Sequence, residues 1–142
     1  MRHEHVLAQL LSNPPVAETV PTAAKSLAGS QATYVNELGS TMSLTFNADL
    51  TLTGTYTSNV SGGGGSVTGP IVGWYNGFVI AWSVLWPSNP PSMTSWVGAF
   101  VTGSQGYNID TMWLLVSQAP QPGNPMDFWN EVNTGSDLFQ PS

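Results

Sequence analysis

The sequence predicts an all-β protein: an eight-stranded antiparallel up-and-down barrel preceded by a non-barrel N-terminal leader. From Tyr34 onward, short runs rich in Thr, Val, Leu and aromatic residues alternate with turns rich in Gly, Asn and Pro. These runs recur at spacings of roughly 8–15 residues, and no long segment between them has the period of a helix. A closed barrel has no exposed strand edges and is therefore favoured over an open sheet, with a β-sandwich as the alternative.

The N-terminal leader is expected to span residues 1–31, and the barrel domain residues 32–142. Within the leader, His5 to Ser12 predicts one or two helical turns, which the following Asn-Pro-Pro would end. The rest of the leader is small and polar, so we expect it to be disordered or docked on the surface. His3 and His5 are its only histidines, and without further ligands nearby they predict no metal site.

The strands of the barrel are indicated by alternating apolar and polar residues. The first hairpin begins in segment 36–41 and continues with Met42, Leu44 and Phe46 alternating with Ser43 and Thr45. Further strands are expected at residues 50–58, 66–69, 77–86, 93–101, 107–117 and 136–139, with a short helix at 126–132 after the Pro-rich loop 118–125.

The segment at the start of the first hairpin places Asn36, Leu38 and Ser40 two residues apart. In a strand, that spacing directs all three side chains to one face. An unpaired buried hydroxyl or amide costs roughly 1–3 kcal/mol. Either water therefore solvates this face, or its polar groups bind a ligand.

The charge of the chain excludes several partners. Of its 142 residues only 2 are basic, Arg2 and Lys25, so the expected barrel has no basic side chain. Such a surface cannot release phosphate counterions, which predicts that neither nucleic acid nor an anionic membrane is a partner. The chain has no Cys, which rules out disulfides and thiol chemistry. The apolar run from Val6 to Leu11 is interrupted by Gln9 and is too short for a clear signal peptide or a membrane span.

Tryptophans from three neighbouring expected strands share the barrel interior by strand parity: Trp82 and Trp86, then Trp96, then Trp113. The simplest interpretation is ordinary core packing. A core packed for stability alone, however, avoids polar groups, whereas a ligand pocket combines apolar walls with a few convergent polar groups. The polar residues expected on the same interior favour a pocket: Asn36, Ser40, Tyr56, Ser58 and Thr94.

Across residues 33–142 the sequence resembles the avidin–streptavidin family. The resemblance rests on six motifs in the family's order: Asn36-Glu37-Leu38-Gly39-Ser40-Thr41, Leu52-Thr53-Gly54-Thr55-Tyr56-Thr57-Ser58, Ala81-Trp82-Ser83-Val84-Leu85-Trp86, Thr94-Ser95-Trp96-Val97-Gly98, Thr111-Met112-Trp113-Leu114-Leu115 and Gly135-Ser136-Asp137-Leu138-Phe139. It implies a barrel that binds biotin non-covalently and sequesters it, with biotin as ligand and no cofactor. It also implies secretion and a homo-oligomer, a homotetramer more than a homodimer.

The resemblance also implies a role for individual residues. Asn36, Ser40 and Tyr56 match three donors to the ureido oxygen of biotin, while Asp137 and Ser58 match acceptors of its two ureido N–H groups. Thr94 matches a contact to the thioether sulfur, Ser92 a contact to the carboxylate tail, and Trp129 a residue that reaches into a neighbouring subunit's site. Gly62 to Gly65 match a lid over the ligand. The apolar walls around the ligand match Leu38, Val60, Trp86, Trp96, Trp113 and Leu115.

Two other binding functions stay open from the residues alone. A lipocalin-like carrier of another small apolar ligand would also need an apolar pocket, and a glycan-binding β module would also present Trp faces and few charges. An enzyme is not predicted, because the expected barrel lacks His, Lys, Arg and Cys, and its carboxylates show no paired spacing for acid–base chemistry.

Overall fold

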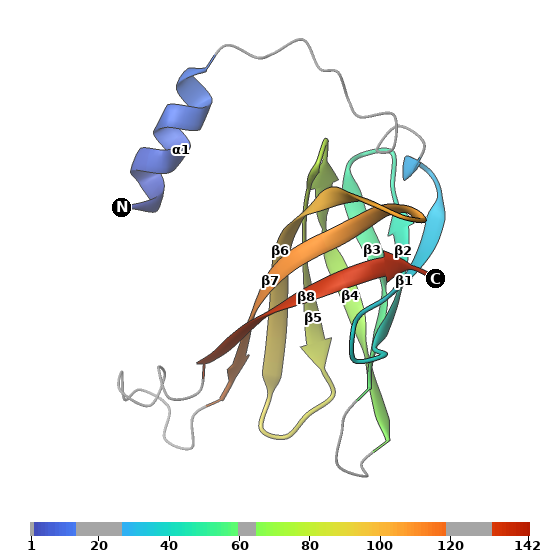
Figure 1. Ribbon diagram of the computed structural model, residues 1–142. Helices are drawn as coiled ribbons and strands as arrows, with labels where there is room; N and C mark the ends of the chain where they lie inside the picture. The colour runs from blue at the N-terminus through green and yellow to red at the C-terminus, as the bar shows by residue number, and fades with distance from the viewer. Residues whose placement is uncertain (1, 14–26, 60–64, 119–131) are drawn as a thin grey trace.

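The computed structural model describes residues 2–13, 27–59, 65–118 and 132–142. Eight strands form a closed barrel in the order β1 to β8, and every neighbouring pair is antiparallel (Figure 1). This confirms the eight-stranded up-and-down barrel over the sandwich. The strands are β1 Gln31–Val35, β2 Thr41–Phe46, β3 Thr51–Asn59, β4 Ser66–Asn76, β5 Val79–Trp86, β6 Ser92–Gly103, β7 Gly106–Ser117 and β8 Val132–Pro141.

β4 and β8 extend furthest beyond their expected bounds, and β6 is also longer than the expected 93–101. β4 continues past Pro70, which pairs with Thr55 of β3, because the fixed φ of proline is compatible with an extended chain. β8 already begins at Val132, the last residue of the expected short helix, because Val132 pairs with Val116 of β7. The rest of that helix, residues 126–131, lies outside the described residues.

The segment that opens the first hairpin is a turn and not a strand. β1 ends at Val35 and β2 begins at Thr41. The backbone N–H of Asn36 donates to the carbonyl of Ser40 at 2.9 Å, and Gly39 has a φ of +81°, a conformation that glycine adopts without steric cost. The expectation of a shared strand face was therefore wrong.

The consequence for the three side chains of this turn is that they separate. Asn36 and Ser40 are buried, whereas Leu38 is 73% exposed. An asparagine side chain can bond to the backbone of its own turn and thereby compete with strand formation. This local bonding, which strand parity ignores, explains the difference.

In the N-terminal leader, α1 spans His3–Ser12, slightly longer than the expected turns, and buries none of its residues. No helix in the described ranges combines the length and the apolar character needed to cross a membrane.

The tryptophans form a row across three strands, as their parity predicted. Trp96 of β6 is in register with Trp82 on one side and with Trp113 on the other. Beyond Trp113 the row ends at Gly135 of β8, where an added Cβ would lie 2.5 Å from the Trp113 ring. A glycine is required there because the indole occupies the space above the strand.

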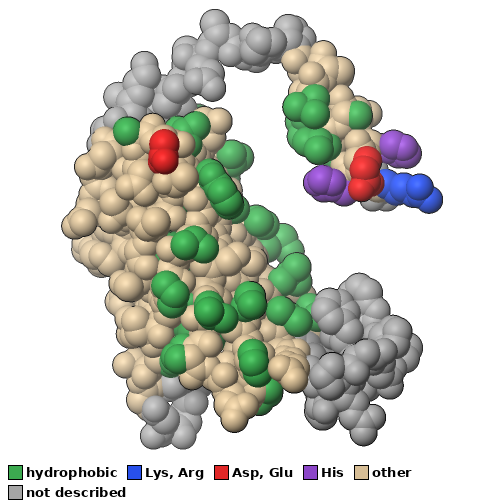
Figure 2. Space-filling view, turned by 180° about the vertical axis from the view of Figure 1, so that it is seen from behind, with side chains coloured by type: hydrophobic (Ala, Val, Ile, Leu, Met, Phe, Trp, Pro, Cys, Tyr) green, Lys and Arg blue, Asp and Glu red, His purple; other side chains and the backbone are tan. Residues whose placement is uncertain are grey.

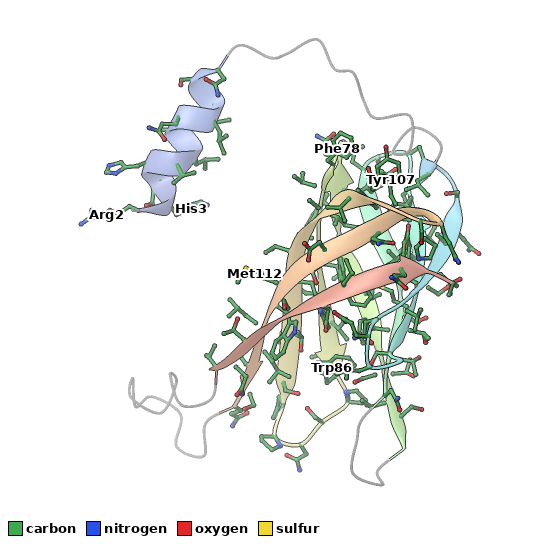
Figure 3. The ribbon with its side chains drawn as sticks, in the orientation of Figure 1. Arg2, His3, Phe78, Trp86, Tyr107 and Met112 are labelled. Atoms are coloured by element: carbon green, nitrogen blue, oxygen red, sulfur yellow. The ribbon has the colours of Figure 1, made fainter. Side chains whose placement is uncertain are left out.

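The barrel has two chemically different ends. Trp86 lies at one end, and Phe78 and Tyr107 lie at the other (Figure 3). Between them the core is apolar, with Phe46 packed edge-on against Tyr75 at a ring distance of 5.0 Å. The Trp86 end is where the buried polar residues gather, so this end holds the candidate site.

The seam that closes the barrel is its shortest strand pair. β1 pairs with β8 only at Tyr34 with Pro141 and at Val35 with Gln140. The backbone N–H of Ser142 adds one bond to the Thr33 carbonyl at 3.0 Å.

Candidate functional site

A cavity of about 180 Å³ opens at the Trp86 end of the barrel. That volume is below the roughly 300–1,000 Å³ of typical small-molecule sites, so it suits a compact ligand. The turn between β1 and β2 and the ends of five strands contribute its lining: Asn36, Leu38, Ser40, Tyr56, Ser58, Asn59, Trp86, Thr94, Trp96, Trp113, Leu115 and Asp137.

Of the expected site residues that the structure describes, all but Ser92 line this cavity. Val60 and Trp129 lie outside the described residues, as do Gly62 to Gly64 of the expected lid. Ser92, the first residue of β6, is described but is absent from the lining, and its hydroxyl pairs with that of Ser88 in the preceding loop at 2.6 Å. The contact of Ser92 with a ligand tail thus depends on the resemblance alone.

Asn36 is held by its own turn in an orientation that directs its amide nitrogen into the cavity. Its Oδ1 accepts the backbone N–H groups of Leu38 at 3.1 Å and of Ser40 at 2.9 Å. Its Nδ2 therefore faces inward, 3.5 Å from the Tyr56 hydroxyl and 3.4 Å from Oδ1 of Asp137. The turn thus provides a fixed N–H donor.

The hydroxyls of Ser40 and Tyr56 are also arranged as donors. Oγ of Ser40 accepts the backbone N–H of Asn59 at 2.9 Å, and its hydroxyl hydrogen, which lies within hydrogen-bond reach of the Tyr56 hydroxyl, remains a donor. Burial, together with the negative charge of Asp137, raises the pKa of Tyr56 above its usual range. The phenol therefore keeps its proton, and the cavity presents three donors at one end.

Asp137 supplies the acceptor beside these donors. Its Oδ2 accepts the indole N–H of Trp96 at 2.9 Å, and its Oδ1 faces the amide of Asn36. Burial raises the pKa of this carboxyl, the Trp96 bond opposes the rise, the charge of Glu37 adds to it, and the Asn36 bond opposes it. The pKa stays raised on balance, so the hydrogen bonds from Trp96 and Asn36 do not fully offset the cost of burying the ionised carboxylate.

Aromatic rings and one hydroxyl form the remaining walls. The Tyr56 ring stacks on Trp96 at 4.8 Å, and Trp86 meets Tyr56 edge-on at 5.7 Å. The Trp86 indole N–H donates to Oγ1 of Thr94 at 2.8 Å, which fixes the ring and leaves the Thr94 hydrogen available. Such rigid aromatic walls bury an apolar ligand at little cost in side-chain entropy.

Sequence reasoning missed three residues near the site. Asn59 lines the cavity and donates from Nδ2 to the Leu38 carbonyl at 2.9 Å. Glu37 and Thr111 contact the strand that carries Asp137. Only the order of residues along β3, in which Asn59 follows Ser58, could have indicated Asn59; the other two contacts join segments far apart in the chain. Within the described ranges, no group of three or more His, Asp or Glu residues could hold a metal ion.

The fold and the site together define a small closed β-barrel with a compact cavity at one end of the barrel. The model of the avidin family matches residues 24–142, and the chain belongs to this family. Its membership confirms the resemblance read from the six motifs.

Individual relatives and solved structures are also similar to this chain. Afifavidin from Afifella pfennigii is 37% identical over 111 residues, which are 75% of this chain and 65% of that protein, so the chain spans slightly less than two thirds of its length. Among solved structures, the short afifavidin–biotin complex has a TM-score of 0.68 at 29% identity and covers 88% of this chain and 100% of its own. The rhizavidin–biotin complex has a TM-score of 0.68 at 28% identity, with 81% and 94% covered.

Proposed function

We propose that this chain binds biotin non-covalently in the cavity at the Trp86 end of the barrel. The observation that carries the proposal is the convergence of three donors beside an acceptor: Asn36, Ser40 and Tyr56 with Asp137. A ureido group presents one strong acceptor oxygen flanked by two N–H donors. The cavity offers the complementary set, because Ser58 lies in the same lining and can accept the second N–H.

The chemistry of such a site is electrostatic preorganisation without a reaction. Donors fixed before the ligand arrives stabilise negative charge on the ureido oxygen, as in an oxyanion hole. A carboxylate that accepts a ureido N–H pushes electron density toward the same oxygen, so the bonds strengthen one another. Avidin-family proteins bind biotin and are not enzymes. The proposed function is therefore binding alone.

Calorimetry tests this proposal with ligands that divide biotin into its parts. Biotin should bind with tight stoichiometric heat, and desthiobiotin, which keeps the ureido group but lacks the sulfur, should bind more weakly. Nonanoic acid, which keeps the carboxylate and an apolar chain but lacks the ureido group, should not bind. Binding of nonanoic acid without binding of biotin would instead favour a general apolar carrier.

We further propose that the protein acts outside the cell and sequesters biotin. The basis for this proposal is membership of the avidin family. Added protein should arrest growth of a biotin-requiring bacterium, and excess biotin should restore it. Growth unaffected by protein that binds biotin in calorimetry would contradict sequestration, and absence of the protein from the culture medium of its source would contradict secretion.

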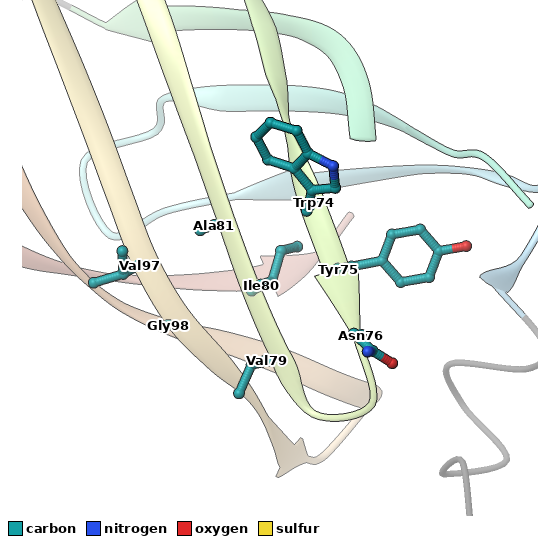
Figure 4. A pocket seen from close by; sticks show the side chains of 8 residues that line it. All are labelled: Trp74, Tyr75, Asn76, Val79, Ile80, Ala81, Val97 and Gly98. Atoms are coloured by element: carbon teal, nitrogen blue, oxygen red, sulfur yellow. The ribbon is translucent and has the colours of Figure 1, made fainter. Parts of the chain in front are cut away.

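We also propose that the chain is a homo-oligomer, with a homotetramer favoured over a homodimer. The outer face of β4 to β7 supports self-association, because Trp74, Ala81, Val97 and Met112 form one register row with Trp74 67% and Met112 64% exposed. Figure 2 shows many hydrophobic side chains on one face of the barrel. A groove in this face is lined by Trp74, Val79, Ala81 and Val97 (Figure 4). Exposed apolar patches of this kind mark protein interfaces, and a second copy offers the same surface.

Replacing Val97 by aspartate should dissociate the oligomer, because the charge would be buried without a partner in the proposed interface. Sedimentation should show a smaller species, while Ser43→Asp on the outer face of β2 should leave the assembly unchanged. An unchanged assembly in Val97→Asp would contradict this interface. That Trp129 reaches a neighbouring subunit's site stays a prediction, because Trp129 lies outside the described residues.

A further inference from the structure

We propose that Glu37 is a positioning residue for Asp137: its carboxylate fixes the backbone of β8 at the site, and its charge raises the pH below which biotin binding is lost. This inference rests on the proposed biotin function for its binding readouts, but its structural part can be tested without ligand.

The first observation is a side chain that replaces a missing strand. β1 leaves the sheet after Val35, which pairs with Gln140, so β8 has no backbone partner on that side at Leu138. The backbone N–H of Leu138 instead donates to Oε1 of Glu37 at 2.9 Å. The Glu37 carboxylate thereby extends the short seam of the barrel by one bond.

The second observation lies on the other side of the same peptide group. The peptide unit between Asp137 and Leu138 carries the Asp137 carbonyl, which accepts the hydroxyl of Thr111 at 2.9 Å. The carbonyl of this unit is thus held by β7 and its N–H, on the other side of β8, by the turn between β1 and β2. Since the unit adjoins the Asp137 Cα, fixing its plane fixes the direction in which the carboxylate enters the cavity.

The third observation is that neighbouring residues of one turn act on both parts of Asp137. Asn36 contacts the side chain of Asp137, and Glu37 contacts the backbone just after it. The turn that carries two of the three proposed oxygen donors is therefore tied directly to the strand that carries the acceptor. A displacement of either segment would misalign both halves of the ureido site.

The charge of Glu37 acts in the opposite direction to its hydrogen bond. Two titratable groups lie near the Asp137 carboxyl: Glu37, whose negative charge helps to raise the pKa of Asp137, and Tyr56, whose own pKa is raised by burial and by the charge of Asp137. Asp110 of β7 is in register with Leu138 and so lies on the other face of the sheet from Asp137. A ureido N–H needs the ionised carboxylate, so Glu37 should raise the pH below which biotin is lost.

Variants at this contact separate the two roles. Glu37→Gln keeps an amide oxygen for the Leu138 N–H but removes the charge. Its biotin Kd near neutral pH should stay within about threefold of the parent, and the acid loss of affinity should move to lower pH. Glu37→Ala removes the contact and should raise the Kd about tenfold, which corresponds to about 1.4 kcal/mol, in the range of one hydrogen bond.

Two further variants serve as controls. Thr111→Val removes the bond to the Asp137 carbonyl without a change of charge, so it should weaken binding but leave the acid limit in place. Asp110→Asn removes one charge from the opposite face of the sheet and should change neither quantity. An acid limit in Glu37→Gln equal to that of the parent overturns the charge role, and an unchanged Kd in Glu37→Ala overturns the positioning role.

Measurements on the ligand-free protein distinguish failure of this inference from failure of the biotin function. By NMR, the Leu138 amide should exchange slowly in the parent and in Glu37→Gln but rapidly in Glu37→Ala, and the Asp137 carboxyl should titrate at lower pH in Glu37→Gln. If biotin does not bind at any pH but these signals behave as stated, the biotin function fails and the Glu37 contact stands. Equal Leu138 exchange in all three proteins overturns the contact itself.

Discussion

Replacing Asp137 by asparagine should weaken biotin binding by roughly 100-fold or more at neutral pH, since a lost hydrogen bond to a charged group costs about 1.5–3 kcal/mol and a buried donor left unpaired costs about 1–3 kcal/mol. The carboxylate accepts both the Trp96 indole and the Asn36 amide, with oxygens left to accept a ureido N–H. Asparagine has one acceptor oxygen, so its amide hydrogens would face one of these donors. The variant loses the ligand bond and leaves a buried donor unpaired.

The pH dependence of binding supplies an independent measure of the same residue. Because the folded pKa of Asp137 is raised, protonation as the pH falls through it stabilises the empty protein but removes the acceptor that biotin needs. Affinity should therefore fall below a pH that lies above the ordinary aspartate value of about 3.9. Calorimetry across this range should show the acid loss in the parent and not in Asp137→Asn, with Asp110→Asn as the control. Parent-like affinity in Asp137→Asn would refute the role assigned to this carboxylate.

Replacing Asn36 by aspartate should abolish most biotin binding while it preserves the turn. The aspartate would still accept the backbone N–H groups of Leu38 and Ser40. Its second oxygen would take the place of a donor and lie about 3.4 Å from Asp137, where two like charges repel by several kcal/mol at an effective dielectric near 20. We expect an affinity loss of at least about 100-fold, the effect of roughly 2.7 kcal/mol.

Asn36→Ala provides the matched comparison. It removes the donor and also the acceptor that organises the turn, so the Ser40 amide should exchange faster than in the parent or in Asn36→Asp. Biotin affinity should fall in both variants. Affinity lost only in Asn36→Ala would mean that Asn36 acts through the turn and not as a donor.

The architecture of the barrel could be predicted from the sequence because strand periodicity is a local signal. The alternation of residues in β5, β6 and β7 placed Trp82, Trp96 and Trp113 on one interior face, and their register confirmed it. The end of β4 was misjudged at Pro70, because a proline signals the loss of one N–H but not whether the neighbouring strands continue. Long-range pairing decides that question, and it cannot be read from adjacent residues.

The sequence predicted only those site residues that belong to the family motifs. They led to Asn36, Tyr56 and Asp137, which the barrel brings together. The alternation of side chains along a strand gave a wrong prediction for residues 36–40, because the Asn36 side chain bonds to the backbone of this segment and holds it in a turn. Glu37 gave no signal at all, since a surface carboxylate in a turn resembles any solvated acid until the fold places β8 beside it.

The stacking of Tyr56, Trp96 and Trp82 gives the molecule a built-in optical probe. The Trp96 ring lies between Tyr56 at 4.8 Å and Trp82 at 5.5 Å, with nearly parallel planes on the Trp82 side. Electronic transitions of chromophores this close couple to one another, so near-ultraviolet circular dichroism should carry a band that belongs to the stack. Because one end of the stack faces the cavity and the other is buried in the core, the occupancy of the site can be followed by light without a label.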